Sequence, residues 1–137
     1  MADVFSKKKR SWIMSRIRSE NTSIDRRMRD MLSEARLKFV MYPDLYGKPD
    51  FQVGKRILVF CDGDFWHGYR YAEKKRPAKK YWREKLERNM KRDRHVSRRL
   101  RTDGWSVLRI WEHDIKRKPE TCKRKIMRKV AERKHLR

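Results

Sequence analysis

Residues 49–68 bring together carboxylates, an imidazole and aromatic rings in a chain that is otherwise strongly basic. Asp50 lies before a pair of short apolar segments, and Asp62, Asp64 and His67 follow the second of them. Carboxylates at neighbouring strand ends can hold Mg²⁺, which prefers oxygen ligands and keeps several of its waters. Asp50 is therefore the first candidate metal ligand, and Asp62 and Asp64 are candidates for a second.

An imidazole and a further carboxylate could supply proton transfer beside such a metal. His67 is a candidate general base, because free imidazole titrates close to neutral pH. Asp93, farther along the chain, could fix the tautomer of His67 and stabilise its protonated form. These residue types together predict metal-assisted hydrolysis of a phosphodiester, with Mg²⁺ as the expected cofactor and Mn²⁺ as a substitute.

Each of these side chains also has a structural interpretation. Asp62 precedes a glycine, as residues in turns often do. Asp93 could pair with a neighbouring arginine on the surface of a helix, and Asp25 fits the acidic position of a helix capping box. The catalytic interpretation depends on Asp50, His67 and Asp93 meeting at compatible points of one small fold.

The charge balance indicates a polyanionic partner. The 137 residues include 41 Lys and Arg against 18 acidic residues, which gives a formal net charge of +23. Such a balance is typical of nucleic-acid binders. No apolar run approaches the length of a membrane-spanning helix, and the two lone cysteines form no disulfide framework or zinc motif. We therefore expect an intracellular protein that binds nucleic acid and no membrane.

The spacing of apolar residues predicts one small α/β domain. Residues 22–36, 78–101 and those after 119 are expected to form helices, with strands at 38–42, 51–53, 56–60 and 105–111. Gly54 and Lys55 predict a two-residue hairpin turn. The long crossover makes the last two strands parallel. The order α-β-β-β-α-β-α predicts a small mixed sheet flanked by helices.

Residues 1–21 precede this domain, which we place at 22–137, and are polar and basic. One interpretation is a solvated arm. The other is a DNA-binding arm whose basic residues, Arg10 and Arg18 among them, bind phosphates.

The aromatic residues near the candidate site have two interpretations. Phe65, Trp66 and Trp82 could pack in the core, or they could form a wedge that enters the base stack and distorts the duplex. Met14 in the arm could act from the other side. One stripe of the helix at 78–101 is apolar at both ends and polar in the middle: Trp82, Leu86, Asn89, Asp93, Ser97 and Leu100. We expect a polar partner opposite that stripe and a DNA contact at Asn89.

Five motifs in order resemble those of the very short patch repair endonucleases, which belong to the PD-(D/E)xK nuclease superfamily. They are RSWIMSRIRSENT (10–22), GKPDF (47–51), DGDFWHG (62–68), NMKRD (89–93) and GWSVLRIWE (104–112). Together they extend over nearly the whole chain. The resemblance implies a restriction-endonuclease-like core and a nick in one strand of duplex DNA at a T:G mismatch, as the first step of mismatch repair.

The resemblance also implies roles for individual residues. Asp50 would ligate Mg²⁺ together with the backbone carbonyl of Cys61, and Asp25 would be an acidic residue near the metal. His67 would be the general base, supported by Asp93. The residues that would contact DNA beside the mismatch are Met14, Phe65, Trp66 and Trp82.

The chain departs from the pattern of its relatives at a structural zinc site. Relatives carry Cys and His ligands around the Phe-Trp-His signature, whereas this chain has Asp64 there and retains a single candidate ligand, His113. One ligand does not make a tetrahedral site. We therefore expect no structural zinc, and a salt bridge of Asp64 in its place.

Two alternatives to a mismatch nuclease remain open. A related nuclease of the homing type, or a nickase of branched or damaged DNA, would use the same chemistry on another target. A non-catalytic nucleic-acid-binding protein would explain the basicity equally well, but it gives no reason for Asp50 and His67 to occur together.

Overall fold

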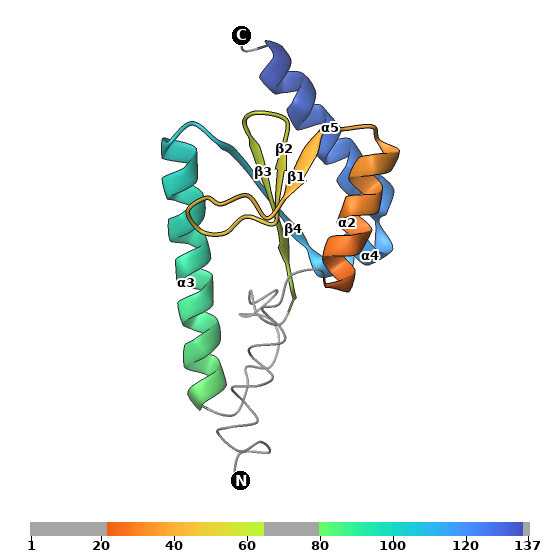
Figure 1. Ribbon diagram of the computed structural model, residues 1–137. Coiled ribbons are helices and arrows are strands. Elements are labelled where there is room, and N and C mark those ends of the chain that lie inside the picture. The colour runs from red at the N-terminus through yellow and green to blue at the C-terminus, as the bar shows by residue number, and fades with distance from the viewer. Residues whose placement is uncertain (1–21, 65–79, 136–137) are drawn as a thin grey trace.

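The computed structural model describes residues 22–64 and 80–135 (Figure 1). The elements are α2 (Ser23–Glu34), β1 (Phe39–Met41), β2 (Phe51–Val53), β3 (Ile57–Asp62), α3 (Lys80–Thr102), β4 (Ser106–Trp111), α4 (Glu112–Arg117) and α5 (Pro119–His135). The predicted α/β fold is confirmed. None of the described helices is long and apolar enough to cross a membrane. The arm at 1–21 and the expected aromatic and imidazole cluster at 65–67 lie outside the described residues.

The four strands form one mixed sheet in the order β1-β2-β3-β4. The first two pairings are antiparallel, and β3 pairs with β4 in parallel, from Ile57 opposite Ser106 to Asp62 opposite Trp111. This confirms the parallel crossover that the sequence predicts. Helix α3 covers one face of the sheet, and α2, α4 and α5 cover the other (Figure 1).

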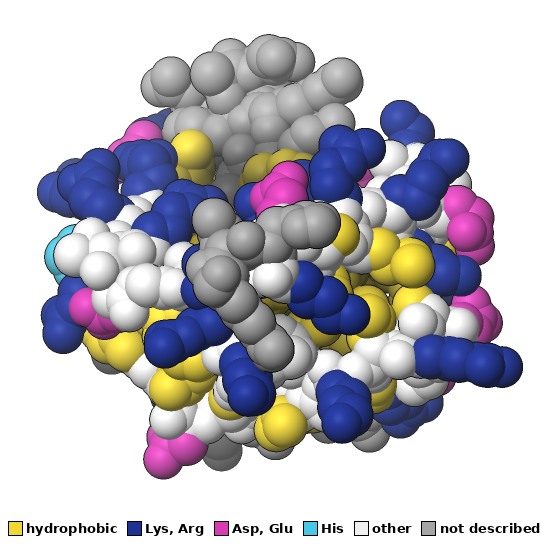
Figure 2. Space-filling model, turned by 90° about the horizontal axis from the view of Figure 1, so that it is seen from above, with side chains coloured by type: hydrophobic (Ala, Val, Ile, Leu, Met, Phe, Trp, Pro, Cys, Tyr) yellow, Lys and Arg dark blue, Asp and Glu magenta, His cyan; other side chains and the backbone are white. Residues whose placement is uncertain are grey.

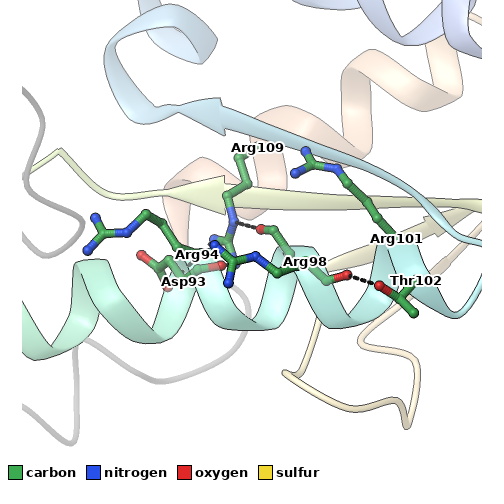
Figure 3. Close-up of a pocket in the computed structure, with 7 residues that line it drawn as sticks. Asp93, Arg94, Arg98, Arg101, Thr102 and Arg109 are labelled. Carbon is green, nitrogen blue, oxygen red and sulfur yellow. Dashed lines mark hydrogen bonds and ion pairs between the residues drawn. The ribbon is translucent and has the colours of Figure 1, made fainter.

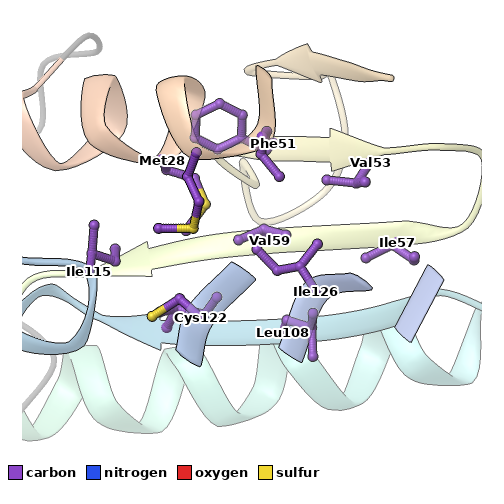
Figure 4. Close-up of a cluster of buried hydrophobic side chains, with 12 residues drawn as sticks. Met28, Phe51, Val53, Ile57, Val59, Leu108, Ile115, Cys122 and Ile126 are labelled. Carbon is purple, nitrogen blue, oxygen red and sulfur yellow. The ribbon is translucent and has the colours of Figure 1, made fainter. Parts of the chain in front are cut away.

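The two faces of β3 belong to two hydrophobic clusters. Ile57 and Val59 point into the larger cluster, against Met28 of α2 and Ile126 of α5 (Figure 4). Leu58 and Phe60 point into a smaller cluster with three further members, Val96, Leu100 and Val107. Because side chains alternate along a strand, the residues that end β3 also point to opposite faces. This alternation separates Cys61 from Asp62.

Helix α2 begins as the sequence predicts. The side chain of Thr22 accepts a hydrogen bond from the backbone N–H of Asp25 at 3.2 Å, which satisfies one donor of the first turn. Met28, Met31 and Leu32 are buried on one face of the helix. Helix α2 is thereby fixed against the sheet with Asp25 in its first turn.

One local prediction is wrong, and one helix was not predicted. Val53 pairs with Ile57, so three residues rather than two connect β2 and β3. The carbonyl of Arg56 instead accepts the N–H of Ser106 at 2.8 Å, which draws Arg56 toward β4. Helix α4 was not predicted, because a six-residue helix is too short to show a 3.6-residue period.

The loop between β1 and β2 is fixed against α3. Gly47 has a φ of +78°, and a Cβ atom built there would overlap Cγ1 of Val96. Leu45 packs on the smaller hydrophobic cluster, and the Arg99 guanidinium lies 5.2 Å from the centre of the Tyr46 ring. This loop ends at Asp50, so its contacts with α3 set the position of that carboxylate.

Candidate active site

Three side chains from separate elements meet at one end of the sheet. Asp25 lies in the first turn of α2, Asp50 precedes β2, and Cys61 is the penultimate residue of β3. One candidate ligand atom from each lies within 4.8 Å of the others. Among the described residues, these three form the one cluster of His, Cys, Asp or Glu side chains that is close enough to hold a metal ion.

Hydrogen bonds fix both carboxylates of this group. The Tyr42 hydroxyl donates to Asp25 Oδ2 at 2.7 Å, and the backbone N–H of Cys61 donates to Asp50 Oδ2 at 2.7 Å. The N–H of Tyr42 also donates to the carbonyl oxygen of Asp50 at 2.8 Å. Tyr42 therefore contacts both acidic residues and holds them in one arrangement.

The chemistry of the donors suits a hard divalent cation. Two carboxylates lie close together, and Asp25 is buried, so a cation between them would offset their mutual repulsion. Burial raises the pKa of the Cys61 thiol well above its ordinary value, and the carboxylates of Asp50, Asp25 and Asp62 raise it further. A protonated thiol is a poor ligand, so the site favours oxygen ligands and an ion such as Mg²⁺.

The structure separates the two interpretations of Asp25. Thr22 caps the helix by accepting from the backbone N–H of Asp25, while the Asp25 side chain turns inward to Tyr42 and lies with Asp50. The carboxylate thus belongs to the acidic group at the sheet end. A capping box alone would not explain why the Asp25 carboxylate lies beside Asp50 and accepts a hydrogen bond from Tyr42.

Asp62 lies apart from the acidic group. It is the last residue of β3, opposite Trp111 in the parallel ladder, so the turn interpretation is wrong. Its carboxylate is nearly fully buried and lies 3.0 Å from Nη1 of Arg109. Because Cys61 and Asp62 point to opposite faces of the sheet, this geometry favours an ion pair over a metal ligand for Asp62.

Arg109 is the polar partner expected opposite the stripe of α3, and the sequence did not identify it. Its Nε donates to the hydroxyl of Ser97 at 2.7 Å, and its Nη1 lies 3.7 Å from Asp93 Oδ1 (Figure 3). Its Nη2 donates to the carbonyl of Asp93 at 3.3 Å. Asp93 therefore pairs across elements rather than with a neighbour on its helix. Arg109 could have been found in the sequence as a charged residue within the apolar strand predicted at 105–111.

Asp64 makes the salt bridge expected of it. Its Oδ1 lies 2.9 Å from Nδ1 of His113, and its N–H donates to Glu112 at 3.3 Å. The other ring nitrogen of His113 lies 3.3 Å from Asp114. These contacts join the segment after β3 to helix α4.

The structure brings together only some of the predicted site residues. Trp82 and Asn89 are half-buried on α3, and the ring of Trp82 lies 5.0 Å from that of Tyr81. The remaining candidates lie outside the described residues: Arg10, Met14, Arg18, Phe65, Trp66 and His67. The proposed contact between His67 and Asp93 is therefore a prediction.

Comparisons with known proteins identify the family of this chain. Residues 2–73 match the family model of the DNA mismatch endonuclease Vsr. The type II nicking enzyme V.NmeDIP of Neisseria meningitidis serogroup C is 38% identical over 96 residues, which cover 67% of this chain and 65% of that enzyme, just under two thirds of its length. The DNA mismatch endonuclease Vsr of Escherichia coli (strain K12) is 40% identical over 116 residues, covering 82% of this chain and 74% of that protein.

A solved structure supports the fold. The catalytic domain of the homing endonuclease I-Bth0305I superposes with a TM-score of 0.55, covering 78% of this chain and 92% of that domain at 19% identity. The family model covers more than half of this chain, and the Escherichia coli relative covers most of it. This chain therefore belongs to the Vsr family of DNA mismatch endonucleases.

Proposed function

We propose that this protein is a Mg²⁺-dependent DNA endonuclease that nicks one strand of duplex DNA at a T:G mismatch. The observation that carries the proposal is the meeting of Asp25, Asp50 and Cys61 at one sheet end, in a member of a DNA endonuclease family. Mismatch recognition is supported by the family description and by the relative of that name in Escherichia coli.

In this mechanism the metal would be held by Asp50 and by the backbone carbonyl of Cys61, with Asp25 beside them. When bound, it neutralises charge on the scissile phosphate and lowers the pKa of a water molecule. His67 takes the proton of the attacking water, and Asp93 orients and stabilises the imidazole. Arg109 holds Asp93 in place through its contacts with both the carboxylate and the carbonyl.

The duplex is bound by two groups of residues in this proposal. The arm at 1–21 binds phosphates through Arg10 and Arg18, ahead of the nuclease domain at 22–137. Phe65, Trp66, Trp82 and Met14 enter the stack beside the mismatch, and Asn89 contacts the DNA from α3. Asp64 contacts His113 of α4 at 2.9 Å, and the absence of a structural zinc belongs to the same proposal.

The charge of the surface supports tight, salt-dependent binding of DNA. Lys and Arg side chains spread across the face seen in Figure 2, with few acidic side chains between them. Each phosphate that a cation neutralises releases a counterion, so affinity should fall steeply with salt. Action as a monomer in the cytoplasm, in association with the nucleoid, belongs to the same proposal.

A nicking panel tests the proposal. Purified protein would be given duplexes with each mismatch, uracil, an abasic site, a branch or no lesion, with Mg²⁺, Mn²⁺ or chelator. We expect metal-dependent nicking at T:G that is lost in Asp50→Asn and His67→Ala. Asp44→Asn removes an exposed carboxylate of the same loop as a control and should nick as the wild type does.

Three outcomes would contradict the proposal in different ways. Equal cutting of matched duplex would remove mismatch specificity. Cutting only of branched or damaged DNA would favour a related nuclease with another target. Binding without any cutting would favour a non-catalytic DNA-binding protein.

A further inference from the structure

We propose that a groove beside α3 binds the phosphodiester backbone of the same duplex, beyond the position of the nick. The groove, called here the arginine groove, has a volume of about 640 Å³. It lies between α3 and β4 and is lined by residues whose side chains are charged or polar: Asp93, Arg94, Ser97, Arg98, Arg101, Thr102 and Arg109. The proposal rests on the proposed function, because it assigns a further part of the surface to the same substrate.

Two guanidinium groups of the groove are held in place. Arg101 Nη2 donates to the carbonyl of Val107 on β4 at 3.1 Å. Arg109 is held by Ser97 at 2.7 Å and by Asp62 at 3.0 Å. Side chains that are already ordered lose little conformational entropy when a ligand binds. The fixed pair therefore forms a preorganised floor for an anion.

Two further arginines form an adjustable rim. Arg94 and Arg98 are exposed and lie one turn apart on α3; the Arg98 side chain extends toward Arg109, and Arg94 extends outward from the helix (Figure 3). Neither makes an ion pair with an acidic side chain in residues 22–64 or 80–135. Their charge is thus available to a ligand.

The balance of charge favours a polyanion. Among residues 22–64 and 80–135, the four arginines of the groove face two carboxylates, Asp93 in the lining and Asp62 behind Arg109, so positive charge is in excess there. Every cation in the lining is arginine, whose planar guanidinium matches phosphate oxygens better than lysine does.

The dimensions suit one strand of a duplex. Arg94 and Arg101 are separated by about 10 Å along the axis of α3, at 1.5 Å per residue. Phosphates of one strand rise by about 3.4 Å per nucleotide along the duplex axis, so a groove aligned with that axis spans roughly three nucleotide steps. It begins at Asp93, which we place beside the general base, and runs toward Thr102 at the far end of α3. The bound segment therefore extends away from the nick.

A pair of charge-matched variants tests this proposal. Arg94→Gln with Arg98→Gln removes the rim. Arg124→Gln with Arg128→Gln removes two exposed arginines, also one turn apart, from α5 on the opposite layer. Affinity for a mismatched and a matched duplex would be measured by fluorescence anisotropy over a series of salt concentrations, without divalent metal so that no strand is cut.

We expect the affinity of the rim variant for DNA to depend less steeply on salt than that of the wild type. The slope of log affinity against log salt should become shallower by about 0.9 for each lost phosphate contact, hence by roughly 2 for the pair. The loss of affinity should have the same fold-change for both duplexes, because phosphates carry no sequence information. Lengthening the duplex on one side of the mismatch should strengthen binding by the wild type and by the α5 variant, but not by the rim variant.

Either of two results would overturn the proposal. One is a slope equal to that of the α5 variant, and the other is a loss confined to the mismatched duplex. If the Gln pair lowers the melting temperature, Arg94→Lys with Arg98→Lys keeps both charges and should retain the wild-type slope; a shallower slope would refute the proposal. Since binding is measured without cutting, failure of the wild type to nick any DNA would contradict the proposed function and leave this measurement intact.

Discussion

Tyr42 and Asp25 are joined by a hydrogen bond of 2.7 Å, in which the phenol hydroxyl donates to Asp25 Oδ2. The two residues are 17 positions apart in the chain, so the bond connects the end of β1 to the first turn of α2. It orients a buried carboxylate beside Asp50. Removing a group that orients a metal ligand commonly lowers metal affinity or activity by about 10- to 100-fold.

Replacing Tyr42 by Phe should therefore weaken metal binding. The ring is kept and a single hydroxyl is lost, so we expect the Mg²⁺ concentration for half-maximal nicking to rise by about 10- to 100-fold. Single-turnover nicking over a Mg²⁺ series measures this, and Mn²⁺ binding measures it independently of cutting. Tyr46→Phe removes a hydroxyl from the exposed Tyr46 of the same loop and should leave the Mg²⁺ requirement unchanged. Identical Mg²⁺ requirements in the two variants would refute this role.

Arg109→Leu should destabilise the protein strongly. Asp62 is 4% exposed and would lose the guanidinium that neutralises it, and Ser97 would lose its donor. Removing one partner of a buried ion pair lowers the free energy of unfolding by about 3–5 kcal/mol. Urea unfolding measures the loss. The double variant Asp62→Leu with Arg109→Leu should recover much of it, because the buried carboxylate that lost the guanidinium is then removed as well; no recovery would mean that the pair is not the cause.

The sequence identified the fold through features that repeat within one element. The apolar face of α2 and the alternation of β3 show the period of a helix or a strand, so burial of Met28 and Val59 could be predicted. Thr22 was identified for the same reason, since a cap is a local pattern. Such signals need no knowledge of the tertiary structure.

The contacts that complete the site are not local. Tyr42 and Arg109 act through partners on other elements, and neither has a spacing that marks it. The sequence predicts Tyr42 as the last residue of a strand. In the structure β1 ends at Met41, and the positive φ of Tyr42, 51°, turns the chain away from the strand. The sequence left Asp62 as either a metal ligand or a turn residue, because the length of β3 depends on its pairing with β4. Such contacts become visible only once the elements are packed.

Cys61 should make stability depend on alkaline pH. Burial, followed by the nearby carboxylates, raises the pKa of its thiol above the ordinary value of 9.0. The folded protein therefore keeps a proton that the unfolded chain loses. The corresponding stability is fully present below pH 9.0 and is lost as pH rises from there toward the pKa of the folded state.

Urea unfolding of the wild type and of Cys61→Ser at pH 8 and pH 10 checks this effect. Lysine and tyrosine titrations are common to both proteins and cancel in the difference. The wild type should lose more stability than the variant, by at most about 1.4 kcal/mol per pH unit for one proton. Equal losses would show that the thiol does not titrate differently in the folded protein.

Gly47 should be intolerant of a side chain for two separable reasons. Its φ of +78° costs a non-glycine residue about 1 kcal/mol, and a Cβ atom would overlap Cγ1 of Val96 on α3. Overpacking of this kind adds roughly 1–3 kcal/mol. Gly47→Ala should therefore lower the free energy of unfolding by both amounts. Because the loop ends at Asp50, nicking should fall as well.

A double-mutant cycle with Val96→Ala separates the two reasons. Removing the two methyl groups of Val96 should relieve the overlap, so Gly47→Ala should cost only the backbone part, about 1 kcal/mol, in that background. Gly54→Ala is the control, since Gly54 also has a positive φ, +60°, but nothing lies within 4 Å of a Cβ there. A full-sized loss for Gly47→Ala in the Val96→Ala background would place the cost in the backbone. The close approach of the loop to α3 would then not be what holds Asp50 in position.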